Sequence, residues 1–144
     1  MHLKKAKEDD LKTFYTISFQ KHIGKNLNTK SLEQFENEYK DEATTFLSVM
    51  RGESIAGYII LVEETETVQL KRIVIDENHL GLGSEVMLLV EEYCLRRLGK
   101  DRLWLDVYTD NARAVHLYEK LGYVRDNEGM ENHREVLFYR KNII

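Results

Sequence analysis

Residues 103–123 read LWLDVYTDNARAVHLYEKLGY, and their hydrophobic periodicity changes halfway along. The first part, residues 103–108, is rich in large and β-branched side chains, which favours a strand. From Asn111 to Leu121 apolar side chains recur three and four residues apart, which predicts an amphipathic helix. Gly122 is the type of residue that ends such a helix. A strand that leads directly into a helix is typical of a sheet covered by helices.

The preceding segment repeats this pattern. Residues 68–75 (VQLKRIVI) predict a strand, and after it Gly81-Leu82-Gly83 leads into a helical stripe that ends near Gly99. Further upstream, apolar runs at 45–50 and 55–62 flank a short turn that contains Gly52, which predicts a hairpin. The centre of the chain is therefore expected to form a meander that continues into strand–helix units.

The two ends of the chain complete the expected order of elements. Residues 2–7 favour a short strand, and helical spacing begins at Glu8. Residues 22–30 are predicted to be a loop. Ser31 and Gln34 have the spacing of a capping box, so a second helix is expected to begin there. Residues 136–139 favour a last strand. We predict an α/β (α+β) fold, a three-layer sandwich with a mixed, partly parallel sheet and flanking helices, as one domain over residues 1–144.

Composition and charge exclude several classes of protein. The 144 residues are 42% hydrophobic and 32% charged, which is normal for a globular domain. The net charge of -4 argues against nucleic acid as a partner, because nucleic-acid binders usually carry a basic excess. Cys94 is the only cysteine, so no intrachain disulfide can form and a reducing cytoplasm is expected. No signal peptide or run of apolar residues long enough to cross a membrane is present, so no membrane partner is expected.

The Gly81-Leu82-Gly83 turn has the character of a phosphate-binding site. The backbone N–H groups at the start of a helix lack partners within the helix, and the helix dipole favours anions there. Glycine lets an anion approach the backbone closely. The alternative is that these glycines only make the turn between strand and helix. A nucleotide-phosphate binder is a further hypothesis, but the turn lacks the lysine of a P-loop.

The later helix is expected to carry a groove. Asn111, Ala114 and Tyr118 fall on nearly the same face, because residues seven apart on a helix are almost eclipsed. The small side chain of Ala114 between two polar residues leaves space along the helix. The sequence therefore indicates a groove along this helix, which strengthens the case for an anion site at the glycine turn.

These two segments resemble the GNAT superfamily of acetyl-CoA-dependent N-acetyltransferases. The pattern Asn111-x-x-Ala114-x-x-x-Tyr118-x-x-x-Gly122-Tyr123 is similar to the second cofactor motif of the family, and Gly81-x-Gly83 falls at its pyrophosphate loop. Residues 103–123 are also somewhat similar to those of ribosomal-protein N-terminal acetyltransferases. The resemblance covers residues 45–125 well and implies a splayed pair of parallel strands that accommodates the cofactor arm.

The resemblance implies that acetyl-CoA is the cosubstrate and that no metal is used. The cofactor-binding residues it implies come from the end of the third central strand, the glycine turn and the later helix: Ile73, Val74, Ile75, Asn78, His79, Leu80, Gly81, Leu82, Gly83, Ser84, Asn111, Ala114 and Tyr118. Ile73 to Ile75 are expected to pair with the pantetheine amides like an added strand. Asn111 is expected to hydrogen-bond the pantetheine arm or a phosphate.

The chain departs from the family pattern at the pyrophosphate loop. Asn78 stands where arginine or glutamine is usual, and His79 replaces a frequent glycine. Ile75 replaces a frequent proline, in a chain that has no proline at all. Because Asn78 is short and uncharged, we expect a weaker grip on the pyrophosphate, with the backbone amides of residues 80–84 retained.

The implied reaction is direct attack of a primary amine, from a small molecule or a protein, on the acetyl thioester. Tyr118 is expected to be the acid that protonates the departing thiolate, because a phenol is protonated at neutral pH. Filling the core is the alternative for this side chain. Asp106 is expected to be the base, and the alternative is a solvated or cap-paired carboxylate. Weaker rivals for the base are Glu66, Gln69, His79 and His116.

The acceptor site is the least determined part. The resemblance implies that the first two helices and their loop, residues 14–30, form it with a late hairpin at 126–134. Tyr15, Phe19, His22 and Tyr39 either line this site or pack the core. A homodimer is possible. The alternative to the enzyme is a catalytically silent acyl-CoA-binding module, and the altered Asn78 and His79 keep that alternative open.

Overall fold

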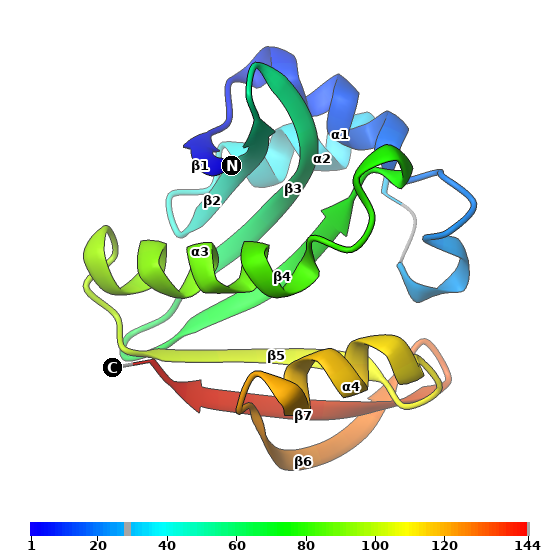
Figure 1. The fold of residues 1–144 in the computed structure, drawn as a ribbon, viewed down its shortest axis with the longest axis vertical. Helices are drawn as coiled ribbons and strands as arrows, with labels where there is room; N and C mark the ends of the chain where they lie inside the picture. The colour runs from blue at the N-terminus through cyan, green and yellow to red at the C-terminus, as the bar shows by residue number, and fades with distance from the viewer. Residues whose placement is uncertain (28–29, 144) are drawn as a thin grey trace.

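The computed structural model describes residues 1–27 and 30–143. Residues 28–29, in the expected loop, and residue 144, at the end of the expected domain, lie outside this part. The elements are β1 (His2–Lys5), η1 (Glu8–Asp10), α1 (Leu11–Ile17), η2 (Gly24–Asn26), α2 (Leu32–Tyr39), β2 (Thr44–Arg51), β3 (Ser54–Glu63), β4 (Val68–Ile75), η3 (Glu77–His79), α3 (Gly83–Arg96), β5 (Arg102–Tyr108), α4 (Ala112–Lys120), β6 (Val124–Glu131) and β7 (Arg134–Asn142) (Figure 1). The η elements are short 3-10 turns.

The strands form one mixed sheet of seven strands in the order β1-β2-β3-β4-β5-β7-β6. Strands β1 to β4 are antiparallel neighbours in the sheet. Short turns join β2 to β3 and β3 to β4, whereas α1 and α2 lie between β1 and β2 in the chain. The pair β4 and β5 is parallel, and α3 makes the crossover between them. Strands β5, β7 and β6 are again antiparallel. The predicted mixed sheet is therefore confirmed.

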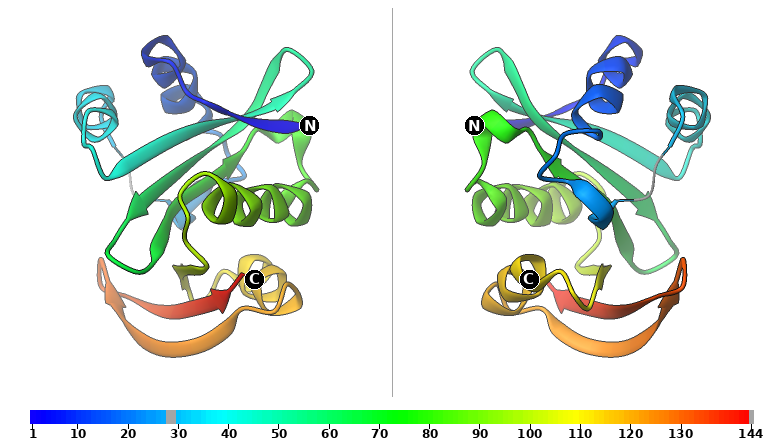
Figure 2. Two further views of the ribbon diagram at one scale, coloured as in Figure 1. Left: turned by 90° about the vertical axis from the view of Figure 1, so that its left-hand side faces the viewer. Right: turned by 90° about the vertical axis from the view of Figure 1, so that its right-hand side faces the viewer.

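Helices cover the sheet on both faces (Figures 1 and 2). On one face α1 and α2 pack through Phe14 and Phe35 against side chains of β2 and β3. On the other face α3 and α4 pack against β3, β4, β5 and β7 in a larger apolar core. The predicted three-layer arrangement is confirmed. No helix in the described ranges is long and apolar enough to cross a membrane.

Most of the predicted elements occur, with bounds a few residues from those expected. The capping box at the start of α2 is present, since the side chains of Ser31 and Gln34 each accept from the other residue's backbone N–H. The first helix is shorter than its apolar pattern, because α1 ends at Ile17 and leaves Phe19 exposed. Although the family resemblance implied a hairpin at 126–134, periodicity did not predict strand β6. Its side chains are mostly exposed and polar, so the sequence shows no alternation there.

Candidate functional site

The parallel pair β4 and β5 separates soon after it begins. The two strands pair only at Val68 with Leu103 and Gln69 with Trp104. In the pairing of β3 with β4, Leu70 and Arg72 oppose consecutive residues of β3, which leaves Lys71 as the extra residue of a β-bulge. A bulge bends its strand and increases the local twist. The bulge therefore accounts for the separation, and the expected splayed pair is observed.

The bulge also exchanges the two faces of β4. Before it, Val68 and Leu70 point into the core with α3 and α4. After it, Val74 points into the core with α1 and α2, and Ile73 and Ile75 take the α3 and α4 side. This follows because one inserted residue shifts the two-residue alternation by one position. The side chain of Val74 is thus buried on the far face.

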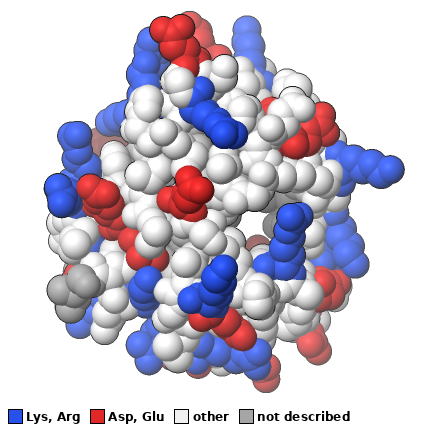
Figure 3. Space-filling model, in the orientation of Figure 1, with Lys and Arg blue, Asp and Glu red and all other residues white. Residues whose placement is uncertain are grey.

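A cavity of about 570 Å³ fills the gap between β4 and β5. Figure 3 shows the surface hollowed between α3 and α4, with Lys and Arg side chains near its rim. The cavity is lined from β4 and the glycine turn by Ile73, Val74, Ile75, Leu80, Gly81, Gly83 and Ser84, and from β5 and α4 by Asp106, Asn111, Ala114 and Tyr118. These residues are far apart in sequence, and the splay brings them together.

The β4 edge that faces the cavity offers backbone hydrogen-bonding groups. Asp76 N–H donates to the Ala56 carbonyl at 2.8 Å, and Gly57 pairs with Ile75 in the same register. By the antiparallel alternation, Val74 bonds to β3, whereas Ile73 and Ile75 direct their N–H and C=O groups away from it. The Ile75 carbonyl accepts from His22 Nε2 at 2.7 Å. An extended ligand with amide groups can therefore pair with the remaining groups of Ile73 and Ile75.

The glycine turn presents unpaired donors to the same cavity. The first hydrogen bond within α3 is from Val86 N–H to the Leu82 carbonyl, and no side chain caps the helix start. The N–H groups of residues 83–85 are therefore free of intrahelical partners, as the dipole argument requires for an anion site. Gly81 has φ +94°, and a Cβ there would meet no atom within 4 Å. Gly81 is itself among the residues that line the cavity.

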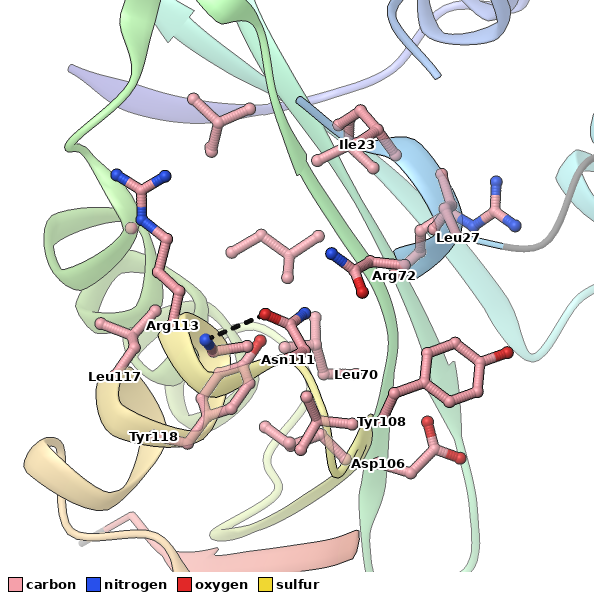
Figure 4. A pocket seen from close by; sticks show the side chains of 18 of the residues that line it. Ile23, Leu27, Leu70, Arg72, Asp106, Tyr108, Asn111, Arg113, Leu117 and Tyr118 are labelled. Carbon is pink, nitrogen blue, oxygen red and sulfur yellow. Dashed lines mark hydrogen bonds between the residues drawn. The ribbon is translucent and has the colours of Figure 1, made fainter. Parts of the chain in front are cut away.

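Asn111 begins α4 and caps it. Its Oδ1 accepts from the Ala114 N–H at 3.3 Å, the dashed line in Figure 4. The carboxamide oxygen is thus engaged by the helix, and the Nδ2 group is the part of this side chain that remains for a ligand. Arg113, His116, Leu117 and Lys120 of the same helix also line the cavity. The positive charges of Arg113 and Lys120 suit a ligand that carries phosphates.

The Tyr118 ring is buried, and its hydroxyl points into the cavity (Figure 4). Burial raises the pKa of this phenol, and the charge of Asp106 raises it further. The hydroxyl therefore stays protonated at neutral pH and can donate a hydrogen bond. Because the pKa is raised, the phenol is a reluctant proton donor, so its hydrogen bond matters more than complete release of its proton.

A buried polar network holds the residue that packs behind Tyr118. The Tyr123 ring meets the Tyr118 ring edge-on, with centroids 5.7 Å apart. The Tyr123 hydroxyl donates to Glu91 Oε2 at 2.7 Å, and Lys141 Nζ donates to Glu91 Oε1 at 3.0 Å. Each member of this buried network has a partner, which is the condition under which buried charges are tolerated.

Tyr123→Phe tests this network. Removal of the hydroxyl takes one hydrogen bond from a buried carboxylate, so we expect a loss of about 1.5–3 kcal/mol in the free energy of unfolding. Tyr39→Phe is the matched control, because its hydroxyl donates to the neutral Ala6 carbonyl and its loss should cost about 0.5–1.5 kcal/mol. Urea unfolding measures both. Equal losses in the two variants would contradict the charged role assigned to Glu91.

Asp106 lies on the opposite face of β5 from Tyr118. Leu105 and Val107 point into the core with α4, so Asp106 and Tyr108 point the other way, as Figure 4 shows. Burial raises the pKa of the Asp106 carboxyl, and the negative charge of Glu131 raises it further. Glu131, at the end of β6, lines the same part of the cavity. A carboxylate with a raised pKa is a stronger base than an ordinary aspartate.

Several expected site residues lie outside the cavity lining. Asn78, His79 and Leu82 do not line it, although their neighbours do. The Asn78 N–H donates to Asp76 Oδ1 at 2.9 Å within the η3 turn, and its side chain is exposed. His79 Nδ1 is buried without a hydrogen-bond partner among the described residues. The turn therefore holds these residues beside the cavity.

Some of the rival bases and candidate acceptor residues line the cavity, and others lie away from it. Gln69 and His116 line the cavity, whereas Glu66 forms an ion pair with Arg102 at 3.3 Å away from it. Of the candidate acceptor residues only His22 lines it. Tyr15 and Tyr39 pack at the edge of the core beneath α1 and α2, and Phe19 is exposed. In the described residues no three His, Cys, Asp or Glu side chains gather as metal ligands would.

The structure adds lining residues that the sequence did not single out. Ile23, Asn26 and Leu27 reach the cavity from the loop after α1, together with Lys30. Lys30 and Lys71 both form ion pairs with Glu38. Burial lowers the pKa of Lys30, although the bond to Glu38 opposes this shift. No periodic pattern marks these residues, because their role depends on how the loop crosses the end of the sheet.

Comparison with known proteins identifies what this geometry is similar to. The sequence profile of the Acetyltransferase (GNAT) family matches residues 8–123. Spermidine N-acetyltransferase from Vibrio cholerae, in complex with CoA and spermine, is similar with a TM-score of 0.83 and 20% identity, over 96% of this chain and 93% of that chain. The dodecameric structure of spermidine N-acetyltransferase from Vibrio cholerae has a TM-score of 0.80 and 19% identity, over 98% and 92%. At these identities the structural likeness establishes the fold.

Proposed function

This chain belongs to the acetyltransferase (GNAT) family, and from that premise we propose that an amine attacks the acetyl group of acetyl-CoA directly in the cavity between β4 and β5. Acetyl-CoA-dependent N-acetylation of an amine is the activity that the family assigns. The family match gives no support to the alternative of a silent acyl-CoA-binding module. The observation that carries the site assignment is the convergence of the free β4 edge, the glycine turn and Tyr118 on one cavity.

The residues present fit acetyl-CoA. The groups of Ile73 and Ile75 that face away from β3 suit the pantetheine amides, and Asn111 Nδ2 lies on the other wall. The free N–H groups of residues 83–85 and the open side of Gly81 suit the pyrophosphate, with Arg113 and Lys120 supplying positive charge. When bound, acetyl-CoA supplies an activated acetyl group and a thiolate leaving group. Because Asn78 is exposed and its N–H is engaged, we propose that the backbone carries the pyrophosphate contact.

Asp106 and Tyr118 act from opposite sides of the splay. An alkylamine with a pKa near 10.4 is almost fully protonated at neutral pH, so a base must take its proton. Asp106 faces the side away from α4, where we propose that it accepts this proton directly or through water. Tyr118 extends from α4 into the cavity, where its hydroxyl donates a hydrogen bond to the departing sulfur.

Direct transfer is supported by the absence of a usable thiol nucleophile. Cys94 is the only cysteine of the chain, and it is fully buried in α3. Burial raises the pKa of its thiol to about 12, with a further contribution from the charge of Glu91. A thiol of this kind carries almost no thiolate at neutral pH. We therefore propose that no acetyl-cysteine forms during turnover.

Two measurements test the proposed function. Calorimetric titration should show binding of acetyl-CoA and none of ATP or NAD, because the glycine turn lacks the lysine of a nucleotide P-loop. Release of free thiol from acetyl-CoA should accelerate when primary amines are added. Tight binding with no acceleration by any amine would favour the silent module. Binding of ATP or NAD in preference to acetyl-CoA would contradict the site assignment.

Gly81→Ala should weaken acetyl-CoA binding. At φ +94° a side chain strains the backbone, and this strain would distort the turn that we propose binds the pyrophosphate, so we expect Kd to rise about tenfold. Gly52→Ala is the matched control, because Gly52 has φ +64° with no atom within 4 Å but lies in the turn between β2 and β3. Calorimetry should give an unchanged Kd for Gly52→Ala. Equal Kd values for the two variants would show that the pyrophosphate does not bind at this turn.

For the partners of the protein, only their chemical class is proposed. The acceptor is an amine, and neither nucleic acid nor a membrane is proposed as a partner. Spermidine N-acetyltransferase from Vibrio cholerae, which has a similar fold, forms a dodecamer. This similarity supports the proposal that this chain also self-associates, with a homodimer as the smallest unit. We further propose a single domain over residues 1–144 that works in the cytoplasm. Light scattering on the purified chain measures the oligomeric state.

A further inference from the structure

The loop after α1 crosses the end of the cavity and is attached on both sides. On the β4 side, His22 Nε2 donates to the Ile75 carbonyl at 2.7 Å, and Gln20 Oε1 accepts from the Glu77 N–H at 2.8 Å. On the β5 side, Lys25 Nζ forms an ion pair with Asp110 at 3.2 Å, in the turn between β5 and α4. Residues 20–27 therefore bridge the ends of the two splayed strands, and we call them the strap.

Arg134 is the anchor of the strap on the β5 side. Its guanidinium stacks on the Tyr108 ring, with Cζ 3.6 Å from the ring centroid. One terminal nitrogen donates to the Lys25 carbonyl, and the other donates to Asp110 Oδ1 at 2.7 Å. The Lys25–Asp110 pair is exposed and contributes little by itself. Arg134 is mostly covered, and its planar fork fixes two groups at once, so it determines the geometry of this contact.

The strap changes the shape of the acceptor path. Without it, the cleft between β4 and β5 would be open at the ends of both strands. With it, β4, the strap and the turn at Asp110 close a ring around the cavity. A ring admits a ligand only end-on. An amine flanked by branched or bulky groups meets the ring before its nitrogen reaches Asp106.

The chemistry of the lining matches a slender cation. Ile23 and Leu27 of the strap give apolar walls for methylene groups, and Asp106 and Glu131 give carboxylates for ammonium groups. Lys30, Lys71 and Arg72 also line the cavity, but the two lysines are paired with Glu38, and Arg72 donates to the Tyr58 hydroxyl at 3.3 Å. A bound pantetheine arm would take part of the volume of about 570 Å³, which limits the room for the acceptor.

We propose that Arg134 is a specificity-determining residue, and that the acceptor is an unbranched aliphatic amine that enters the ring end-on. This inference rests on the proposed function, since it concerns the acceptor of the same reaction. Amines on a branched carbon, such as the α-amine of a peptide, are discriminated against by the closed ring. Loss of the Arg134 fork opens the ring and reduces the discrimination.

The test compares two acceptors in the full chain. The probes are 1,4-diaminobutane and a short lysine-free peptide that begins with alanine, and kcat/KM is measured for each by thiol release. The wild type should prefer the diamine, and Arg134→Ala should lower the ratio of the two kcat/KM values by about tenfold or more. Arg140→Ala is the matched control. It removes an exposed arginine of the same strand, paired with Asp126 at 3.2 Å, and should leave the ratio unchanged.

A second variant covers the case in which Arg134→Ala does not fold. Arg134→Lys keeps the positive charge but cannot span the Lys25 carbonyl and Asp110 together, so its ratio should fall like that of the alanine variant. A ratio that stays near the wild-type value in a folded variant overturns the proposal. A wild-type preference for the peptide also overturns the proposal, but it leaves the proposed acetyltransferase function intact. Binding of acetyl-CoA without acceleration by either amine overturns the proposal together with the proposed function.

Discussion

Tyr118→Phe should lower kcat by about two orders of magnitude or more, with little change in the affinity for acetyl-CoA. The ring of Tyr118 is buried against Tyr123, so phenylalanine keeps the packing and removes only the hydroxyl. The hydroxyl is the group that points into the cavity on the α4 side. Its loss removes the hydrogen bond to the departing sulfur, which strengthens as negative charge develops there.

Stopped-flow thiol release and calorimetry measure the two quantities separately. Tyr93→Phe is the matched control, because Tyr93 lies on α3 outside the lining of the cavity and should keep the wild-type kcat. A Tyr118→Phe variant that binds acetyl-CoA and releases thiol as fast as the wild type would show that this tyrosine only fills the core.

Asp106→Asn should lower kcat/KM by about a hundredfold and remove the acidic limb of the pH profile. The base works only when ionised, so the wild-type rate should rise with pH through the pKa of Asp106. Burial and Glu131 raise that pKa, which places the limb above the ordinary aspartate value of about 3.9. Asparagine cannot accept the proton at any pH. If the variant keeps the acidic limb of the wild-type pH profile, another group is the base. His116 and a water bound by Gln69 are the alternatives among the residues that line the cavity.

The same substitution should stabilise the fold at neutral pH. Because the pKa of Asp106 is higher in the folded chain than in the unfolded chain, the folded state binds more protons between the two values. Stability conferred by the protonated form is lost as pH rises through the folded pKa. Asp106→Asn removes this loss, so its Tm should exceed that of the wild type at pH 7 and match it near pH 4. Asp101→Asn, at an exposed position before β5, should show no such difference.

The strands that position the site were readable from the sequence. The run 68–75 coincides with β4, and residues 102–108 form β5, because both are dense in apolar side chains that two covered faces require. The helix starts were readable from Ser31 and Asn111, which cap α2 and α4. The site around the glycine turn and Tyr118 followed from these elements and from the family motif.

The remaining features depend on contacts that local patterns do not encode. The bulge at Lys71 turns Val74 away from the gap, and the run VQLKRIVI gives no sign of it. Strand β6 is polar and exposed, and pairing with β7 is what makes it a strand. The strap joins groups 53 residues apart at His22 and 109 residues apart at Arg134. Such contacts exist only once the sheet has formed.

Initial-rate kinetics with both substrates varied tests the direct transfer of the acetyl group most plainly. We expect double-reciprocal lines that intersect, because amine and acetyl-CoA must occupy the cavity together between Asp106 and Tyr118. The N-acetylated amine and the free thiol should then form in equal amounts. Parallel lines, with an acetylated protein detectable by mass spectrometry before the amine is added, would contradict the account, because they would require a covalent acetyl-enzyme.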